Sequence, residues 1–437
     1  MNERINRLSK TLGPGILFAS TAIGVSHLVQ STRAGADFGF ALIGFVILAS
    51  LFKYPFFEYG SRYANVTGTS IIDGYKKLGK HALLFYFLIT IASMFFVTAA
   101  VGFVTAGFLE NLFQIEFLGI WTVVILFLIC AAILGIGKYR VLDGLIKIIV
   151  FVLIVSTVMA FILALVNGPV EKAIDFKPKI IWNQAGIFFL IALMGWMPTA
   201  VDLSSWNSLW TLERIKQTGF KPRLKETIFE FRLAYVVTTI LALFFLTLGA
   251  YIFFGSGEIL PNDNALFAHK VVTLYTETIG DWSYLIISSA AFSVMFGTII
   301  AVFDGYARSL SRTVELLFKQ NNSKSKFQFK KLYLIFIFVH VVGALFVIVL
   351  FENKLKELVD FATIVSFLIA PVIAIFNFKL VSGKYLDKQS QPAIWLKILS
   401  FLGIIFLSGF AVFFIITRFY CIFYSDFIEF VSNNQLF

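Results

Sequence analysis

Two stretches of this sequence decide its fold: GPGILFASTAIGVSHLVQ at residues 13–30 and IALMGWMPTAVDLSSW at residues 191–206. Each is apolar enough for a membrane helix, and each carries a signal that breaks one. In the first, small residues surround Gly24 in the middle of the run. In the second, Gly195 and Pro198 lie mid-run, and proline removes a backbone donor and clashes with the preceding turn. We therefore predict two interrupted transmembrane helices.

The composition of the whole chain agrees with a membrane location. Of its 437 residues, 59% are hydrophobic and only 14% are charged, and the mean hydropathy is +0.87. Soluble domains are roughly 45–50% apolar and about 25% charged, so an ordinary soluble enzyme and a disordered chain are both excluded. The alternating strands of a membrane β-barrel would leave a much weaker hydropathy signal. We predict an all-α membrane protein with many spans.

A bilayer core of about 30 Å needs roughly 20 apolar residues in each helix. Eleven segments meet this requirement, and we expect each of them to cross the membrane. They are 13–32, 38–60, 82–108, 117–136, 145–166, 185–210, 232–254, 282–307, 332–351, 358–380 and 394–416.

Basic residues predict the orientation of the chain. The formal net charge is +11, and 24 of the 36 basic residues fall in segments on one side of the predicted spans, against 8 on the other. Because cytoplasmic loops carry the excess of Lys and Arg, we expect a cytoplasmic N-terminus and an outside C-terminus in a bacterial inner (plasma) membrane. The basic loops therefore need neither a nucleic-acid nor a lipid ligand to explain them, and we expect membrane lipid around the protein and no nucleic-acid partner.

The two interrupted spans are the first and the sixth, five apart. We therefore predict two five-helix repeats, about 13–166 and 185–380, with an extra helix at 394–416, in one transporter domain covering 1–437. The first repeat starts inside and the second outside, so they are inverted. Broken helices in matching positions of two inverted halves indicate the binding site of a secondary transporter.

Three stretches carry a family resemblance. Residues 13–44, GPGILFASTAIGVSHLVQSTRAGADFGFALIG, the SRYANVTG at 61–68 and the pair Met197-Pro198 resemble the Nramp (natural resistance-associated macrophage protein) family of divalent-metal transporters. The resemblance implies a leucine-transporter-type fold with alternating access. In typical members it also implies proton-coupled uptake of manganese or ferrous iron.

The departures from the family pattern fall on its metal site. The family's Asp-Pro-Gly-Asn in span 1, whose Asp and Asn bind metal, falls without gaps on positions 24–27, which read Gly-Val-Ser-His. In span 6 the metal-binding Met is kept as Met197, but the His after proline is Thr199. A hard divalent cation prefers oxygen ligands, whereas a thioether and an imidazole suit a softer ion such as Cu(I). We expect a metal-cation transporter with an altered metal site.

The candidate site follows from these positions. We expect substrate contact at Gly24, His27, Met197, Thr199 and Asp202, with His27 and Met197 as the metal ligands. An acid within a membrane span is a functional hypothesis by default, so Asp202 either replaces the lost carboxylate or carries a coupled proton; the alternative is a structural hydrogen bond. His27 is likewise either a ligand or proton carrier, or a polar residue that fills the kink.

Other ionisable residues have structural interpretations. The i,i+4 spacing of Asp304 and Arg308 predicts an ion pair at the end of span 8, with a gate as the alternative. We expect Lys53 to extend its ammonium toward the membrane surface. His340, alone in span 9, is interpreted as a core residue with its hydrogen bonds satisfied.

Two other functions remain open. The absence of a span-1 carboxylate, together with helix N-termini exposed at a break, favours a small organic solute or an anion as the cargo. A membrane sensor that transports nothing is the third hypothesis. The sequence contains neither a nucleophile–base arrangement nor a cofactor motif, so we expect no enzyme activity and no bound cofactor.

Overall fold

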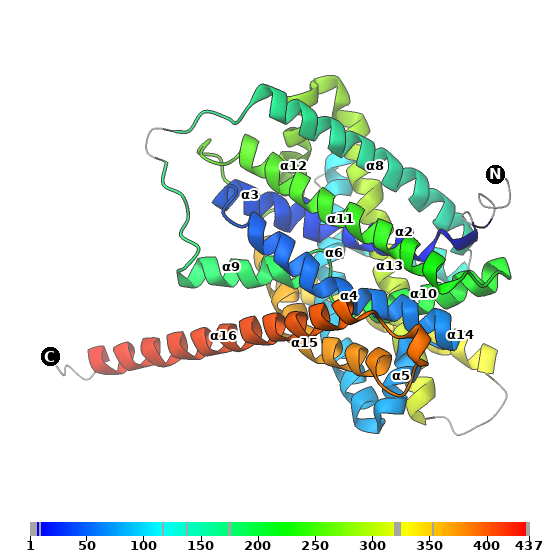
Figure 1. Cartoon of the computed structure of the whole chain (residues 1–437). Coiled ribbons are helices and arrows are strands. Elements are labelled where there is room, and N and C mark those ends of the chain that lie inside the picture. Colours follow the sequence, from blue (N-terminus) through cyan, green and yellow to red (C-terminus); the bar gives the residue numbers. More distant parts are fainter. Residues whose placement is uncertain are drawn as a thin grey trace.

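The computed structural model describes residues 7, 10–115, 118–136, 139–173, 176–318, 325–351 and 354–433. These residues form helices and connecting turns without a strand, which confirms the predicted all-α class. Figure 1 shows a helical bundle from which the last helix, α16, extends past the other helices.

Within the described residues, seven helical segments are long and apolar enough to cross a membrane. They belong to α6 (Lys80–Phe113), α8 (Tyr139–Asn167), α11 (Leu224–Ile252), η2 with α13 (Asp281–Ser283 and Tyr284–Phe318), α14 (Ser325–Leu350), α15 (Leu355–Ser382) and α16 (Ile394–Asn433).

The other four predicted spans form helices that are shorter, more charged or broken. They are span 1 as α2, η1 and α3 (Pro14–Ala22, Ser26–Ser31 and Thr32–Phe38), span 2 as α4 (Ile43–Thr67), span 4 as α7 (Ile120–Ile136), and span 6 as α9 and α10 (Gln184–Gly195 and Leu203–Thr218). The two predicted breaks are therefore confirmed. The residue limits of the two inverted repeats stay a prediction.

Two further helices form in segments that we expected to be loops. They are α5 (Ile71–Leu78) and α12 (Asn264–Ile279). Ser70 and Asp73 form a capping box at the start of α5, and the Asp263 side chain accepts from the Leu266 N–H, 2.9 Å away, at the start of α12. Side-chain caps satisfy the free N–H groups of a first turn, so polar residues that give no span signal still begin helices.

Small residues let the first span pack closely against the seventh. A Cβ atom on Gly35 of α3 would overlap the Leu246 carbonyl oxygen of α11, and one on Gly249 would overlap that of Thr32. Small residues at such contacts allow membrane helices to approach closely. The same two spans also meet at the start of α2, where the Glu230 carboxylate of α11 accepts from the N–H groups of Gly13 and Gly15, 3.0 and 2.7 Å away.

Candidate functional site

The first break lies between α2 and η1. The α-helix stops at Ala22, and the chain resumes at Ser26 as one stretch of π-helix before α3. Because π-helical turns inside α-helices often mark functional sites, this segment agrees with the predicted interruption of span 1.

The second break lies between the end of α9 at Gly195 and the start of α10 at Leu203. The intervening residues contain Pro198 and carry no regular helix. Gly195 is required there because a Cβ atom would overlap the Thr363 carbonyl oxygen of α15. The end of α9 is thus packed against span 10 at the point where its helix stops.

A small cavity joins the two breaks. Its volume is about 20 Å³, which is about the space that one water molecule needs. Its lining includes four hydroxyl side chains and two indoles, from Thr21, Ser26, Thr199, Thr298, Trp196 and Trp206. Among the described lining residues none is charged.

Gly24 lies against α13. A Cβ atom at this position would be 2.7 Å from Thr298 Cγ2 and 2.9 Å from its Oγ1. The Thr298 hydroxyl also donates toward the Ser20 carbonyl oxygen, 2.8 Å away. Thr298 therefore fills the space that a side chain at Gly24 would need.

His27 is fully buried and contacts α11. Its Nε2 lies 2.8 Å from the Thr238 carbonyl oxygen, and its Nδ1 lies 2.7 Å from Ser26 Oγ. Because a carbonyl can only accept, Nε2 carries a proton and donates to Thr238. Both ring nitrogens are used within the protein, so His27 would have to release Ser26 before Nδ1 could bind a metal.

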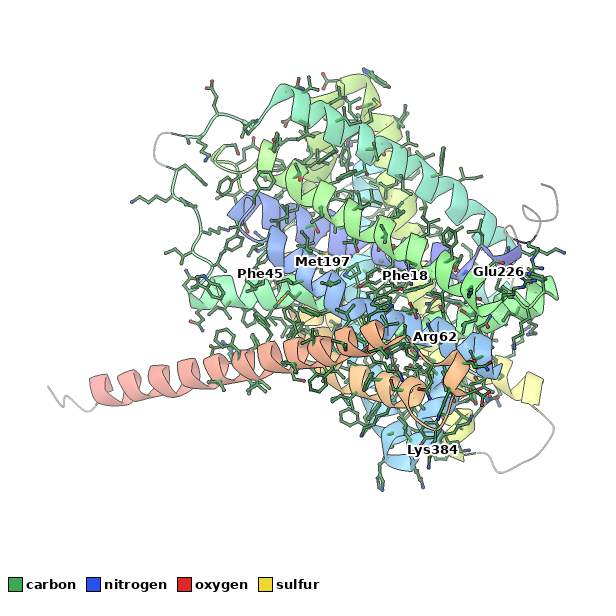
Figure 2. All side chains as sticks on the ribbon, in the orientation of Figure 1. Phe18, Phe45, Arg62, Met197, Glu226 and Lys384 are labelled. Atoms are coloured by element: carbon green, nitrogen blue, oxygen red, sulfur yellow. The ribbon has the colours of Figure 1, made fainter. Side chains whose placement is uncertain are left out.

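Met197 is in the interior, as Figure 2 shows, and its exposure is 0%. Its Sδ lies 4.0 Å from the Oγ of Ser31, which is the last residue of η1. The structure therefore brings Met197 to the first broken span. Its neighbour Thr199 lines the cavity instead.

Lys53 is the residue of this site that the sequence interpretation missed. It is fully buried in α4, so the expected extension toward the membrane surface is wrong. Its Nζ donates to the carbonyl oxygens of Met194, Gly195 and Thr199, 2.5, 2.8 and 3.2 Å away. The ammonium thus lies in the second break. Helix ends that stop inside a protein need such partners for their last carbonyls.

Asp202 is the last residue of the second break and directly precedes α10. It is buried, and its carboxylate does not cap that helix. The charges of Asp202 and Lys53 interact electrostatically. The one carboxylate predicted for the site therefore lies within electrostatic range of a positive charge of the protein itself.

Asp304 and Arg308 lie in a cluster on the side of α13 that faces α10 and α14. Arg308 Nε lies 2.8 Å from Asp304 Oδ1. The same carboxylate accepts from Trp210 Nε1 at 3.1 Å and from the Tyr333 hydroxyl at 2.8 Å. Three helices therefore meet on this ion pair.

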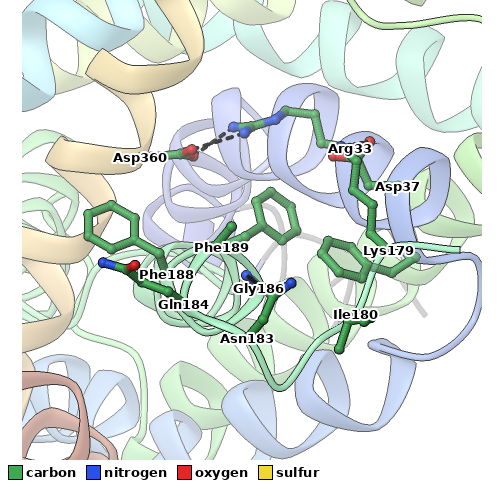
Figure 3. A pocket seen from close by; sticks show the side chains of 12 residues that line it. Arg33, Asp37, Lys179, Ile180, Asn183, Gln184, Gly186, Phe188, Phe189 and Asp360 are labelled. Carbon is green, nitrogen blue, oxygen red and sulfur yellow. Dashed lines mark hydrogen bonds and ion pairs between the residues drawn. The ribbon is translucent and has the colours of Figure 1, made fainter. Parts of the chain in front are cut away.

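A larger pocket of about 570 Å³ lies next to the other end of the first broken span (Figure 3). At its edge the Arg33 guanidinium makes a two-point contact with the Asp360 carboxylate, with N–O distances of 2.6 and 2.9 Å. Gln30 donates to the same carboxylate at 2.9 Å. The sequence interpretation did not single out this contact between α3 and α15, because residues 327 positions apart show no spacing signal.

His340 corrects a further expectation. It is fully buried between the rings of Phe303 and Tyr306, and neither ring nitrogen has a hydrogen-bond partner. It is therefore not a core residue with satisfied hydrogen bonds. In the part of the chain that the structure describes, no group of three His, Cys, Asp or Glu side chains is arranged to hold a metal ion.

Comparison with known sequences gives a consistent result. The family model described as natural resistance-associated macrophage protein-like matches residues 15–417. An uncharacterized protein of Pasteurella multocida is 36% identical over 407 residues, which cover 92% of this chain and 91% of that protein. A divalent metal cation transporter, MntH, of Latilactobacillus sakei is 24% identical over 273 residues, covering 60% of this chain and 59% of the transporter.

Solved structures share the fold. A mutant of the Eremococcus coleocola manganese transporter superposes with a TM-score of 0.70 at 14% identity, covering 93% of this chain and 86% of that one. MhsT in complex with L-phenylalanine gives a TM-score of 0.53 at 13% identity, with coverages of 91% and 98%. These likenesses confirm the predicted leucine-transporter-type arrangement with broken first and sixth spans.

Proposed function

This chain belongs to the Nramp family, and on that premise we propose that it moves a metal cation across a membrane by alternating access through an altered site. Membership of this family points to an integral membrane transporter rather than an enzyme. The metal, its coupling to protons and the orientation of the termini are parts of the proposal.

The observation that carries the proposal is the cavity that joins the two breaks. Broken helices expose backbone groups in the middle of a membrane protein, where cargo and coupling ions bind in transporters with inverted repeats. Thr199 and Ser26 come to this cavity from the two different breaks. The site is thus built from both predicted repeats, as movement of one against the other requires.

The altered part of the site is its donor set. Met197 supplies a thioether, whereas Gly24 supplies no side chain and has no room for one. His27 joins the ligands only after Ser26 Oγ leaves its Nδ1. A thioether with an imidazole favours a soft cation over a hard one, and Asp202 is the group we assign to the coupled proton.

Uptake by the purified full-length protein in liposomes tests this function. Manganese, ferrous iron, magnesium and copper(I) are each supplied outside, with and without an inward proton gradient. We expect uptake of at least one cation above that of liposomes without protein, and faster uptake with the gradient. If calorimetry finds no binding and no cation enters, the metal proposal is wrong.

A non-metal solute is the second candidate. The buried ammonium of Lys53 and the hydroxyl lining of the cavity favour it, because neither is a usual ligand of a hard divalent ion. Counterflow of small labelled polar solutes and anions in the same liposomes distinguishes the two. Solute exchange without any cation uptake supports this second function.

A further inference from the structure

The Lys53 ammonium is surrounded by backbone carbonyl oxygens. Met194 and Gly195 are the last two residues of α9, so their carbonyls lack the N–H partner that a continuing α-helix would supply four residues later. The Met194 oxygen accepts a backbone hydrogen bond from the Met197 N–H, 3.4 Å away. The C-terminal end of a helix also carries partial negative charge. With the Thr199 carbonyl from the break itself, these groups converge on one nitrogen at 2.5, 2.8 and 3.2 Å.

This arrangement has the form of a cation site. Carbonyls of unwound segments and half-helix ends are the groups with which broken membrane helices bind positive ions. An ammonium has three N–H donors, and the three carbonyl oxygens use all of them. Lys53 is fully buried, and these contacts hold its Nζ in the break.

An acidic side chain of the protein also acts on the charge of Lys53. Asp202 lies close enough to interact with it electrostatically, and the position of the family's span-1 carboxylate is Gly24. A divalent ion at these carbonyls would therefore meet a positive neighbour and gain no free negative one. Like charges at short range repel strongly where water is excluded.

We propose that Lys53 is a specificity-determining residue, a cation tethered to the protein that occupies the carbonyl site of the second break and excludes divalent metal ions from it. A divalent ion then binds these carbonyls only when the ammonium leaves. The cargo of the unmodified site carries at most one positive charge. This inference rests on the proposed function, because it concerns the same break.

Binding measurements test the inference without transport. Full-length protein in detergent is titrated with manganese(II) chloride by calorimetry, as wild type, Lys53→Gln and Lys53→Met. Gln keeps an N–H donor for the carbonyls without the charge, and Met keeps the length of the side chain. We expect the variants to bind manganese at least about tenfold more tightly than wild type.

Lys356 provides the matched control. Its Nζ also donates to a backbone carbonyl, that of Leu260 at 2.9 Å, but it lies in the first turn of α15. Lys356→Met should leave manganese binding unchanged. Gel filtration and thermal unfolding identify the variants that are folded.

The outcomes separate two roles of Lys53. If it only satisfies the end of α9, its variants lose stability and gain no manganese, and this result overturns the proposal. Wild-type binding as tight as that of Lys53→Gln overturns it too. If the wild type takes up a cargo but neither Lys53 variant binds manganese more tightly, the inference is wrong and the proposed function stands. If the Lys53 variants bind manganese more tightly but the protein transports no cargo, the proposed function is wrong and the inference stands.

Discussion

Thr298 fills the space beside Gly24: a Cβ atom at position 24 would lie 2.7 Å from the Thr298 Cγ2. The position where the family places a metal-binding carboxylate is thus closed by a side chain from α13. Restoring an acid there requires more than one substitution.

Gly24→Ala should lower the free energy of unfolding by about 1–3 kcal/mol, the usual cost of overpacking. Thr298→Ala in the same chain should recover part of this loss, because it removes both close atoms. Thermal unfolding in detergent measures the effect. Gly44→Ala is the control, because nothing lies within 4 Å of a Cβ atom there, and equal loss at Gly44 and Gly24 would contradict the steric explanation.

His27→Ala should destabilise the protein by about 1–3 kcal/mol, because it removes the buried hydrogen bond from Nε2 to the Thr238 carbonyl oxygen. His27→Gln, which keeps an N–H donor, should recover part of the loss. The control is His269→Ala at an exposed residue, where we expect a change below about 0.5 kcal/mol. A shift in the unfolding midpoint no larger than that of His269→Ala would show that the Thr238 contact contributes nothing.

Met197→Ala should raise the Michaelis constant for cation uptake roughly tenfold, because the site loses one soft ligand. The Met197 Sδ points to the first break, 4.0 Å from Ser31 Oγ. Met94→Ala is a matched control, since Met94 is also buried but belongs to α6 and not to either break. Unchanged uptake by Met197→Ala, with both variants folded, would remove Met197 from the ligands.

Asp360→Asn should destabilise the protein by about 2 kcal/mol, because the Arg33 guanidinium then loses its charged partner in a largely buried position. Asp37→Asn tests the neighbouring pair with Lys179, which is more exposed. Exposed pairs contribute about 0–1 kcal/mol, so this control should change little. Similar midpoints of thermal unfolding for the two variants would contradict this ranking.

Asp304→Asn should slow transport while leaving the Michaelis constant nearly unchanged. Its carboxylate holds α10, α13 and α14 together through Trp210, Arg308 and Tyr333, none of which lines the central cavity. Glu213→Gln is the milder control, because Glu213 approaches Arg308 only at 3.8 Å. A changed Michaelis constant with an unchanged maximal rate would place Asp304 in cargo binding instead.

The sequence predicts the spans and the breaks because hydropathy and helix-breaking residues are local signals. Gly195 and Pro198 mark the second break, and α9 stops there. The extension of α13 to Phe318, beyond the predicted end at residue 307, was missed because polar residues can continue a helix outside the apolar region. Helix α12 was missed for a similar reason, since it is short and partly polar.

The environment of single polar residues could not be predicted. Lys53 and His340 were interpreted by residue type, as an exposed ammonium and a satisfied histidine, and both interpretations were wrong. Which side of a helix faces a break depends on neighbours far away in the sequence, such as Met194 for Lys53, 141 positions away. A single sequence gives the type of each residue and its position in the helical repeat. It does not give the backbone carbonyls that surround that residue in the folded protein.

The π-helical stretch η1 has a consequence for engineering the chain. It accommodates one residue more than an α-helical turn would hold, and it stands before α3, which carries Arg33. Deleting one residue from Ser26–Ser31 would let this segment become an ordinary α-helical turn, and the residues after it would keep their direction. Arg33 would then still face Asp360, so a chain shortened by one residue here should keep the contact between the first and the tenth span.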